Sequence, residues 1–365
     1  MKFAFSFILL LHGLIHLIGF VKAFQFASIN QLTQSISKPI GILWLLTFIL
    51  LVVGAISFIL KKDWWFFVVI IAVVLSQIVI VMSWKDAKFG TMPNVIILLV
   101  SISAFGNYHF NVMIKKEVHA VMANSSNNPT IISKEDYNHL PEIVQKWLNT
   151  SGVVGKQKVV SVRLKQTGEM RTKPDASWMP FKATQYYNIE HPSFIWCTEV
   201  EAFSNIKMIG RDKFNHGKGS MLIKLASLIP VVDESDNEQI NSGTMLRFLG
   251  EVCWFPSGAS NDYITWETID STSAKATFKM NQKSVSGVFK FNLNGDIVSF
   301  EADRYYGGGK NTKLEKWVIS VEDYKVFEGI KIPYKCRVTW KLKEGDFNWL
   351  NLEIVDMEYN IHEIY

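Results

Sequence analysis

Cysteine is scarce in this sequence, and the few that occur lie far apart. Only Cys197, Cys253 and Cys336 are present among 365 residues, without the Cys-x-x-Cys spacing of a zinc site or a redox dithiol. An odd number also excludes a fully paired disulfide framework, although one bridge would still be compatible with an oxidising compartment. We therefore predict that each cysteine packs as a small apolar side chain.

Arginine is absent from the first 115 residues, which hold eight lysines and only two acids, Asp63 and Asp86, for a net charge of +6. The remainder holds 30 basic and 31 acidic side chains, so the overall net charge of +5 belongs to the first third of the chain. Without a basic excess, the longer part lacks the electrostatic footprint of a nucleic-acid-binding domain. Nucleic acid is therefore excluded as a partner.

The sequence also lacks the common catalytic motifs. It contains no Gly-x-Ser-x-Gly elbow, no His-Glu-x-x-His pair, no Walker loop and no Gly-x-Gly-x-x-Gly following a strand. These absences favour a role other than catalysis. We assign no catalytic residue, and we predict neither a bound metal nor a resident cofactor for the leading hypothesis below.

Long apolar stretches dominate the beginning of the chain. They run from Ala4 to Phe24, Ile40 to Leu60, Trp64 to Trp84 and Met92 to Ile114, and short charged or polar connectors separate them. Each has roughly 20 residues, the length that crosses the core of a bilayer. We predict a four-helix transmembrane bundle over residues 1–116.

The first apolar stretch is expected to stay in the membrane rather than to be cleaved as a signal peptide. It contains two histidines and is followed by three further apolar stretches. Five lysines flank the predicted spans on one side and four on the other. The positive-inside rule therefore indicates no orientation for the soluble part.

Histidines within the predicted spans form a candidate polar site. His12 and His16 lie four residues apart on one helical face, and His109 lies in the fourth span. One interpretation is a site for haem, a metal or a quinone, because imidazoles inside helix bundles bind such groups. The other is hydrogen bonding between helices. The possible partners are Ser76, Gln77 and Asn107.

The chain becomes more polar after the fourth stretch. Turn-forming residues from Asn124 to Pro129 predict a linker over residues 117–132, followed by a soluble domain over residues 133–365. An amphipathic helix is expected from Pro141 to Leu148. Beyond Gly155 the apolar residues alternate with a period of two, without a βαβ rhythm. The pattern predicts an α+β domain with roughly a dozen antiparallel strands.

Two local patterns in the soluble domain stand out. Asn294-Gly295 separates two alternating runs and predicts a hairpin. Residues 241–253 have helical spacing instead, and such a helix would either complete the core of the sheet or cover a lipid-sized cavity. The candidate ligand-binding residues in this part of the chain are Arg247, Glu251, Trp254 and Trp266.

Several segments resemble an uncharacterised bacterial family with four N-terminal transmembrane helices and a C-terminal β domain. They are His12–Phe24, Leu32–Pro39 and Gly41–Trp44 in the membrane part, and Leu228–Asp233, Leu246–Pro256 and Trp266–Asp270 in the β domain. The resemblance implies a soluble domain similar to LolA-like lipoprotein carriers, in which a curved sheet or incomplete β-barrel and covering helices enclose an apolar cavity. It implies no particular catalytic or binding residue.

These observations lead to one hypothesis and two alternatives. The leading hypothesis is a membrane-anchored binding module for a lipid, a lipidated protein or another apolar ligand, with the lipid bilayer itself as a partner. The first alternative is a redox membrane protein that binds haem or quinone through its transmembrane histidines, and the second is a sensor or assembly scaffold. In each case we expect a multi-pass protein of a bacterial inner membrane.

Overall fold

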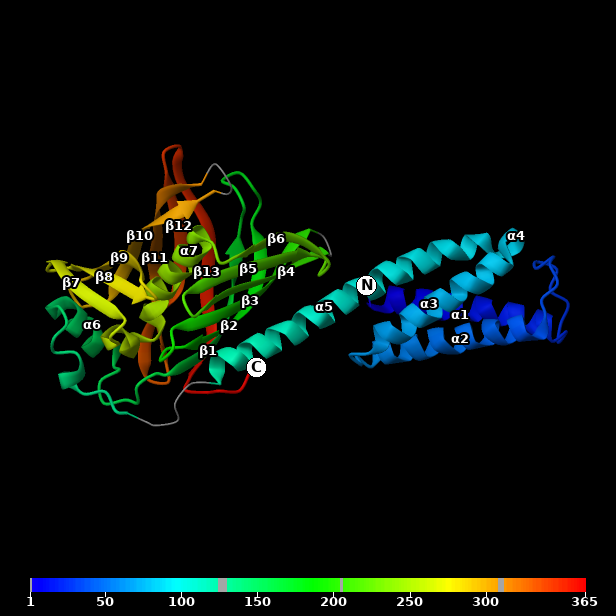
Figure 1. The fold of residues 1–365 in the computed structure, drawn as a ribbon, viewed down its shortest axis with the longest axis horizontal. Helices are drawn as coiled ribbons and strands as arrows, with labels where there is room; N and C mark the ends of the chain where they lie inside the picture. The colour runs from blue at the N-terminus through cyan, green and yellow to red at the C-terminus, as the bar shows by residue number, and fades with distance from the viewer. Residues whose placement is uncertain (1, 124–129, 204–205, 308–311) are drawn as a thin grey trace. The chain divides into compact units, whose positions relative to one another are not determined.

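The computed structural model describes residues 2–123, 130–203, 206–307 and 312–365. The chain forms two compact units, Met1–Val112 and Met113–Tyr365. Figure 1 shows the first unit as a group of helices and the second as a large sheet with a few helices. The turn sequence from Asn124 to Pro129, on which the predicted linker rests, lies outside the described residues, and residues 117–122 are helical.

Long helices make up the first unit. They are α1 (Lys2–Ala23), α2 (Lys38–Ile59), α3 (Trp65–Met82) and α5 (Thr91–Met122), with the short turns α4 (Trp84–Ala87) and η1 (Lys88–Gly90) between the last two. Four helical segments, the last being Trp84–Met122, are long and apolar enough to cross a membrane. Each coincides with one of the predicted stretches. The last continues further than predicted, because α5 ends only at Met122.

Small residues bring these helices together and leave large apolar side chains outside. Gly19 of α1 lies against the ring of Trp44 in α2, and Gly54 of α2 lies against Val69 in α3, so that a Cβ at either glycine would collide with its neighbour. This close approach is typical of helices that pack in lipid. Exposed side chains on the outer faces include Phe7, Leu14, Ile42, Ile49, Phe67, Ile71, Val74, Ile78, Ile96 and Leu99.

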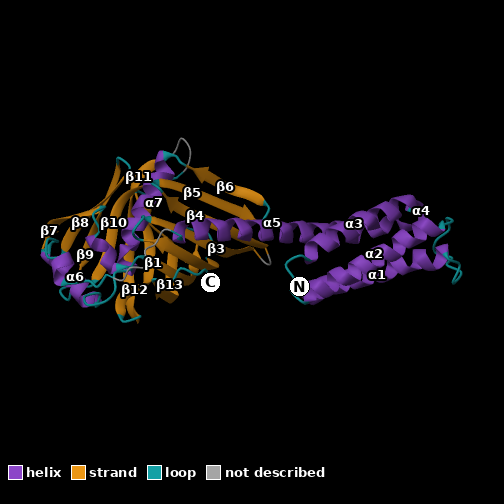
Figure 2. Cartoon of the chain, turned by 60° about the horizontal axis from the view of Figure 1, so that its bottom comes forward, coloured by secondary structure: helices purple, strands orange, loops and turns teal. Residues whose placement is uncertain are grey.

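One antiparallel sheet dominates the second unit (Figure 2). Its strands are β1 (Ser161–Met170), β2 (Met179–Asn188), β3 (Ser193–Phe203), β4 (Ile206–Asn215), β5 (Lys218–Leu225), β6 (Ile229–Ser235), β7 (Ile264–Asp270), β8 (Ser273–Met280), β9 (Lys283–Phe291), β10 (Ile297–Tyr306), β11 (Lys313–Phe327), β12 (Ile330–Leu342) and β13 (Gly345–Tyr359). The order is β6-β5-β4-β3-β2-β1-β13-β12-β11-β10-β9-β8-β7. The sheet is open, with β6 and β7 at its edges, which confirms the predicted antiparallel fold class.

The sheet curves around helix α7 (Glu238–Gly250). This helix contacts β4, β5 and β6 near one end of the strand order and β8, β9 and β10 near the other, and Figure 1 shows it within the curve of the sheet. Asn237 caps its start, because its Oδ1 accepts a hydrogen bond of 2.9 Å from the backbone of Ile240. Asn241 ties the first turn to the sheet, since its Oδ1 accepts a hydrogen bond of 2.6 Å from the backbone of Gly219 in β5. The 3-10 turns η3 (Glu251–Trp254) and η4 (Pro256–Ser260) follow, so the helix predicted at residues 241–253 consists of α7 and η3.

A single large aromatic core fills part of this curve. Helix α6 (Glu142–Ser151), preceded by the turn η2 (Lys134–Asp136), packs Trp147 against Trp266 and Phe289, with ring centroids 6.2 and 6.4 Å apart. The predicted hairpin joins β9 to β10, and Gly295 has the positive φ of 89° that such a turn requires. Strand β6, which contains Pro230, was not predicted. A proline is tolerated there because β6 is an edge strand.

The end of α5 covers part of the opposite face of the sheet. Val118, Val121 and Met122 pack against Tyr186 and Ile195 of strands β2 and β3. Beside them, the carboxylate of Glu117 pairs with Arg211 Nε at 3.1 Å and with Lys213 Nζ at 2.5 Å in strand β4. Residues 113–122 of α5 are therefore a structural part of the second unit.

Candidate functional site

A cavity of about 350 Å³ lies between the sheet and the α7–η3 segment. Alternation along the strands supplies most of its wall, because every second side chain points to the same face. Strand β3 contributes Trp196, Thr198 and Val200, and strand β5 contributes Met221 and Ile223. The volume lies within the range of small-molecule binding sites.

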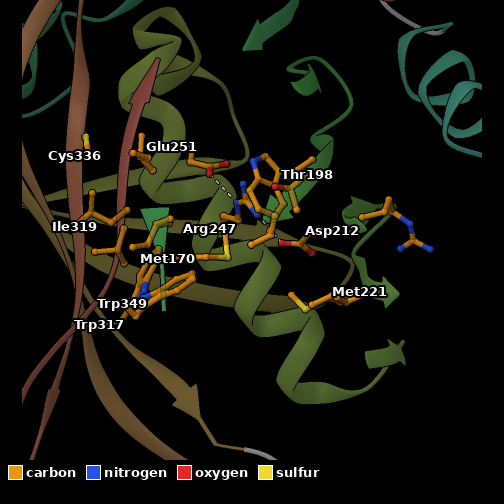
Figure 3. A pocket seen from close by; sticks show the side chains of 18 of the residues that line it. Met170, Thr198, Asp212, Met221, Arg247, Glu251, Trp317, Ile319, Cys336 and Trp349 are labelled. Atoms are coloured by element: carbon orange, nitrogen blue, oxygen red, sulfur yellow. Dashed lines mark hydrogen bonds and ion pairs between the residues drawn. The ribbon is translucent and has the colours of Figure 1, made fainter. Parts of the chain in front are cut away.

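The lining is apolar over most of its extent. Four methionines, Met170, Met179, Met208 and Met221, line the cavity together with Trp317 and Trp349, and Figure 3 shows Met170, Trp317 and Trp349 gathered in one part of it. Methionine side chains are unbranched and adaptable, so they accommodate apolar ligands of varied shape. This part of the wall offers contact area rather than specific polar recognition.

Charged side chains form a second part of the wall, centred on Arg247 of α7. Its Nη1 donates to Asp212 Oδ2 of β4 and its Nε to Glu251 Oε1 of η3, both at 2.8 Å. The guanidinium also lies over the rings of Phe194 and Trp196, at 5.0 and 4.9 Å from their centroids. Figure 3 shows Arg247 between the two carboxylates.

Both carboxylates of this cluster are nearly inaccessible, with side-chain exposures of 4% for Asp212 and 7% for Glu251. Glu251 Oε2 accepts hydrogen bonds from Tyr187 at 2.7 Å and from Gln185 at 3.0 Å. Burial raises the pKa of Glu251, and attraction to Arg247 only partly offsets this effect. Burial alone would lower the pKa of Arg247, but the attraction of Glu251 and Asp212 outweighs it and raises that pKa.

The structure brings together three of the four ligand-binding residues predicted from the sequence. Arg247, Glu251 and Trp254 all line the cavity. Trp266 does not: its Nε1 donates to the carbonyl of Ala259 at 2.9 Å, and its ring lies in the aromatic core beside α6. This residue is a core residue because β7, at the far edge of the sheet, turns its inner face towards α6 and η4.

Three charged residues of the cavity were missed, Arg211, Asp212 and Arg304. Asp212 and Arg304 continue an alternation that was visible in the sequence. In β4 the inward side chain two positions after Gly210 is Asp212, and in β10 the inward positions of Phe300 and Ala302 lead to Arg304. A charge at an inward position of a strand is costly unless it is paired. The alternation could therefore have identified Asp212 and Arg304 as candidate site residues.

A second polar cluster lies among the helices of the first unit. His12 Nε2 donates to Asn94 Oδ1 at 2.9 Å, and Ser76 Oγ donates to the same oxygen at 3.0 Å. Asn94 Nδ2 then donates to Gln77 Oε1 at 3.0 Å, and Gln77 Nε2 to Thr91 Oγ1 at 3.1 Å. The predicted residues His12, Ser76 and Gln77 thus meet through Asn94, which the sequence did not single out.

His16 has a buried ring nitrogen without a hydrogen-bond partner. Its Nδ1 lies 2.8 Å from the carbonyl oxygen of His12, and since a carbonyl only accepts, Nδ1 carries the proton and Nε2 carries a lone pair. Among the described residues, neither His16 Nε2 nor the nearby Trp44 Nε1 has a hydrogen-bond partner. Both side chains line a cavity of about 340 Å³ together with His12, Asp86 and Phe89.

The structure does not bring His109 into this cluster. His109 is exposed, and the ring contact recorded for it is with Phe105, at 6.4 Å between centroids. Asn107, expected as a possible partner of the histidines, is exposed as well. These side chains do not reach the cluster, because residues 107–109 lie more than three turns beyond Asn94 along α5.

Comparisons with known proteins place the chain in a family. Among solved structures it is similar to a LolA superfamily protein of Nitrosomonas europaea, with a TM-score of 0.34, 11% identity and coverage of 60% of this chain and 94% of that one. It is also similar to a DUF1329 family protein of Desulfovibrio piger, with a TM-score of 0.34, 10% identity and coverage of 64% and 95%. No curated protein matches the sequence. A model of the DUF6544 family matches residues 130–352, and the chain therefore belongs to this family of unknown function.

Proposed function

We propose that this protein is a membrane-anchored binding module, in which four helices cross a lipid bilayer and the β domain holds an apolar ligand. The observation that carries the proposal is the apolar cavity of about 350 Å³ between the sheet and α7. Protein interiors are packed closely and have few voids larger than a water molecule. A cavity of this size, with methionine and tryptophan over most of its wall, fits an acyl chain or another apolar group.

The charged cluster supports the same function by keeping the cavity open. Arg247 links α7 to Asp212 in β4 and to Gln185 in β2, at 2.8 and 3.2 Å. These bonds hold the helix at a fixed distance from the sheet, so the wall does not collapse into the cavity. The cavity is thus preformed, and a preformed site binds with a smaller entropic cost than one that must be ordered.

Membrane anchoring rests on the first unit. Its helices are of spanning length, and their outward side chains are large and apolar. The polar side chains His12, Ser76 and Asn94 are buried and hydrogen-bonded to one another, as intramembrane polar groups must be. Anchoring would keep the β domain beside a supply of lipid-like ligands.

The test uses full-length protein purified in a non-ionic amphipol. We expect organic extraction and mass spectrometry to recover an amphiphile in roughly equimolar amount, and the delipidated protein to bind a dansyl-labelled fatty acid at a single saturable site. Denatured protein carried through the same extraction controls for lipid that adheres nonspecifically. Recovery of no amphiphile, together with no saturable binding, would contradict the proposal.

The unpartnered nitrogen of His16 favours a second candidate function, a redox or quinone-binding site among the helices. The lone pair on Nε2 borders the cavity of about 340 Å³ and suits either a haem iron or the hydroxyl of a quinol. His12 is less suited, because its Nε2 already bonds Asn94. Within the described residues, no cluster of three metal-ligating side chains is present.

Replacing His16 with alanine discriminates this candidate from a purely structural role. If the site holds haem, the purified wild-type protein has a Soret band that the variant loses. If it holds a quinone, extraction recovers quinone from the wild type and at least about tenfold less from the variant. A matched His109→Ala variant, at an exposed position, should behave as the wild type. Absence of both haem and quinone from the wild type refutes the candidate.

A further inference from the structure

Three arginines line the cavity of the β domain, and they differ in how their donors are used. Arg247 donates to Glu251, Asp212 and Gln185. Arg211 donates to the carbonyl and hydroxyl oxygens of Ser220, at 2.8 and 2.6 Å, and pairs with Glu117. Both guanidinium groups are therefore occupied by the protein itself.

Arg304 is the exception. In the described part of the chain its guanidinium donates no hydrogen bond and has no carboxylate within 4.0 Å, although it carries five N–H donors. It stacks instead on Trp317, with 4.7 Å from Cζ to the ring centroid, and lies 6.0 Å from the centroid of Trp340. Ring faces attract the cation, but they leave the in-plane N–H groups without an acceptor.

Neighbouring residues determine the space around the Arg304 side chain and its charge. A Cβ at Gly243 of α7 would lie 3.3 Å from Arg304 Nε, so the absence of a side chain at Gly243 leaves room for the guanidinium between helix and sheet. Burial lowers the pKa of Arg304 to about 10, and attraction to Asp212 offsets this only in part. Arg304 is still a cation at neutral pH, and its side chain lines the cavity.

Resting on the function proposed above, we propose that the ligand of the cavity is an anionic amphiphile, whose carboxylate or phosphate head group binds Arg304 while its acyl chain lies among Met170, Met179 and Met208. The half-buried guanidinium lines the cavity without an ion-pair partner among the described residues, and an oxyanion supplies acceptors that match the fork of a guanidinium. The indole ring of Trp317 holds that fork in one orientation. The head group thus completes a set of hydrogen bonds that the protein leaves open.

The test compares three ligands with the same 16-carbon chain: hexadecanoate, hexadecyl phosphate and hexadecanol. Each is titrated into full-length delipidated protein in non-ionic amphipol, for the wild type and for Arg304→Met. We expect the wild type to bind at least one of the two anions more tightly than the alcohol. Arg304→Met should weaken anion binding about 10- to 100-fold and leave hexadecanol binding unchanged.

Controls separate a head-group site from a packing role. Arg304→Lys keeps the charge, and should retain more of the anion affinity than the methionine variant although it lacks the planar fork. Methionine at this position removes no hydrogen bond within the protein, so Arg304→Met should unfold at the temperature of the wild type. Tighter binding of the carboxylate points to a free fatty acid as the source, and tighter binding of the phosphate to a phospholipid.

The outcomes that overturn the inference are distinct from failure of the proposed function. Equal wild-type affinities for all three ligands, unchanged in Arg304→Met, would refute the head-group site and leave the apolar binding function standing. An equal loss for all three ligands in Arg304→Met would show that the residue only shapes the wall. No binding of any ligand to the wild type would refute the binding function, and the head-group site with it.

Discussion

Replacing Arg247 with methionine is expected to lower the free energy of unfolding of the β domain by about 3–5 kcal/mol, since removing one partner of a buried ion pair leaves an uncompensated charge. Here two carboxylates are left, Asp212 and Glu251, both almost fully buried. The measurement is pulse proteolysis in urea of the full-length protein in nanodiscs, which follows cleavage of the β domain. The loss should appear as a lower urea midpoint.

Two further variants establish that the effect comes from buried charge. Lys165→Met breaks an ion pair with Asp356 whose members are 42% and 46% exposed, so it should cost no more than about 1 kcal/mol. Adding Asp212→Asn and Glu251→Gln to the Arg247→Met background removes the stranded charges and should recover most of the lost stability. A midpoint for Arg247→Met no lower than that of Lys165→Met would show that the cluster does not hold α7 on the sheet.

The sequence predicted those helices and strands in which a regular spacing of apolar residues extends over the whole element. The four apolar stretches predicted α1, α2, α3 and α5, because a helix in lipid must be apolar on its outer face throughout its length. Alternation predicted the antiparallel strands, and Asn294-Gly295 predicted the hairpin between β9 and β10. Edge strand β6 was missed because its side chains are largely exposed, so no alternation marks it.

The site was predictable only in part, for a physical reason. Arg247 and Glu251 lie four residues apart, so their pairing follows from helical geometry alone. Asp212 and Arg304 come close to them only through the curvature of the whole sheet, which joins strands far apart in the sequence around α7. Asn94 was likewise missed among the helices, since its hydrogen bond to His12 depends on the packing of α5 beside α1.

Filling the cavity should abolish ligand binding without unfolding the domain. Ile223 of β5 lines the cavity, and its backbone neighbours in the sheet are Gly210 and Val232. Tryptophan at position 223 would occupy space that the ligand uses. We expect Ile223→Trp to weaken binding of an acyl chain at least about tenfold, because displacing two buried CH₂ groups already costs about 1.6 kcal/mol.

Lys224→Trp is the matched control, since it introduces the same side chain at the next position of β5. Lys224 is not among the residues that line the cavity, and successive side chains of a strand point to opposite faces. This variant should bind as the wild type does. Both variants should keep the free energy of unfolding of the wild type within about 1 kcal/mol, because the added ring of Ile223→Trp enters existing space rather than a packed core.

The most direct measurement is photolabelling of the full-length protein in non-ionic amphipol with a diazirine-labelled fatty acid, followed by mass spectrometry of the labelled peptides. Ligand in the cavity predicts labels on the strands that carry Met208 and Met221, at equal yield in the wild type and Lys224→Trp and at about a tenth of that yield in Ile223→Trp. Labels confined to the outer apolar faces of α1, α2, α3 and α5, with the same yield in all three proteins, would contradict a ligand site in the β domain.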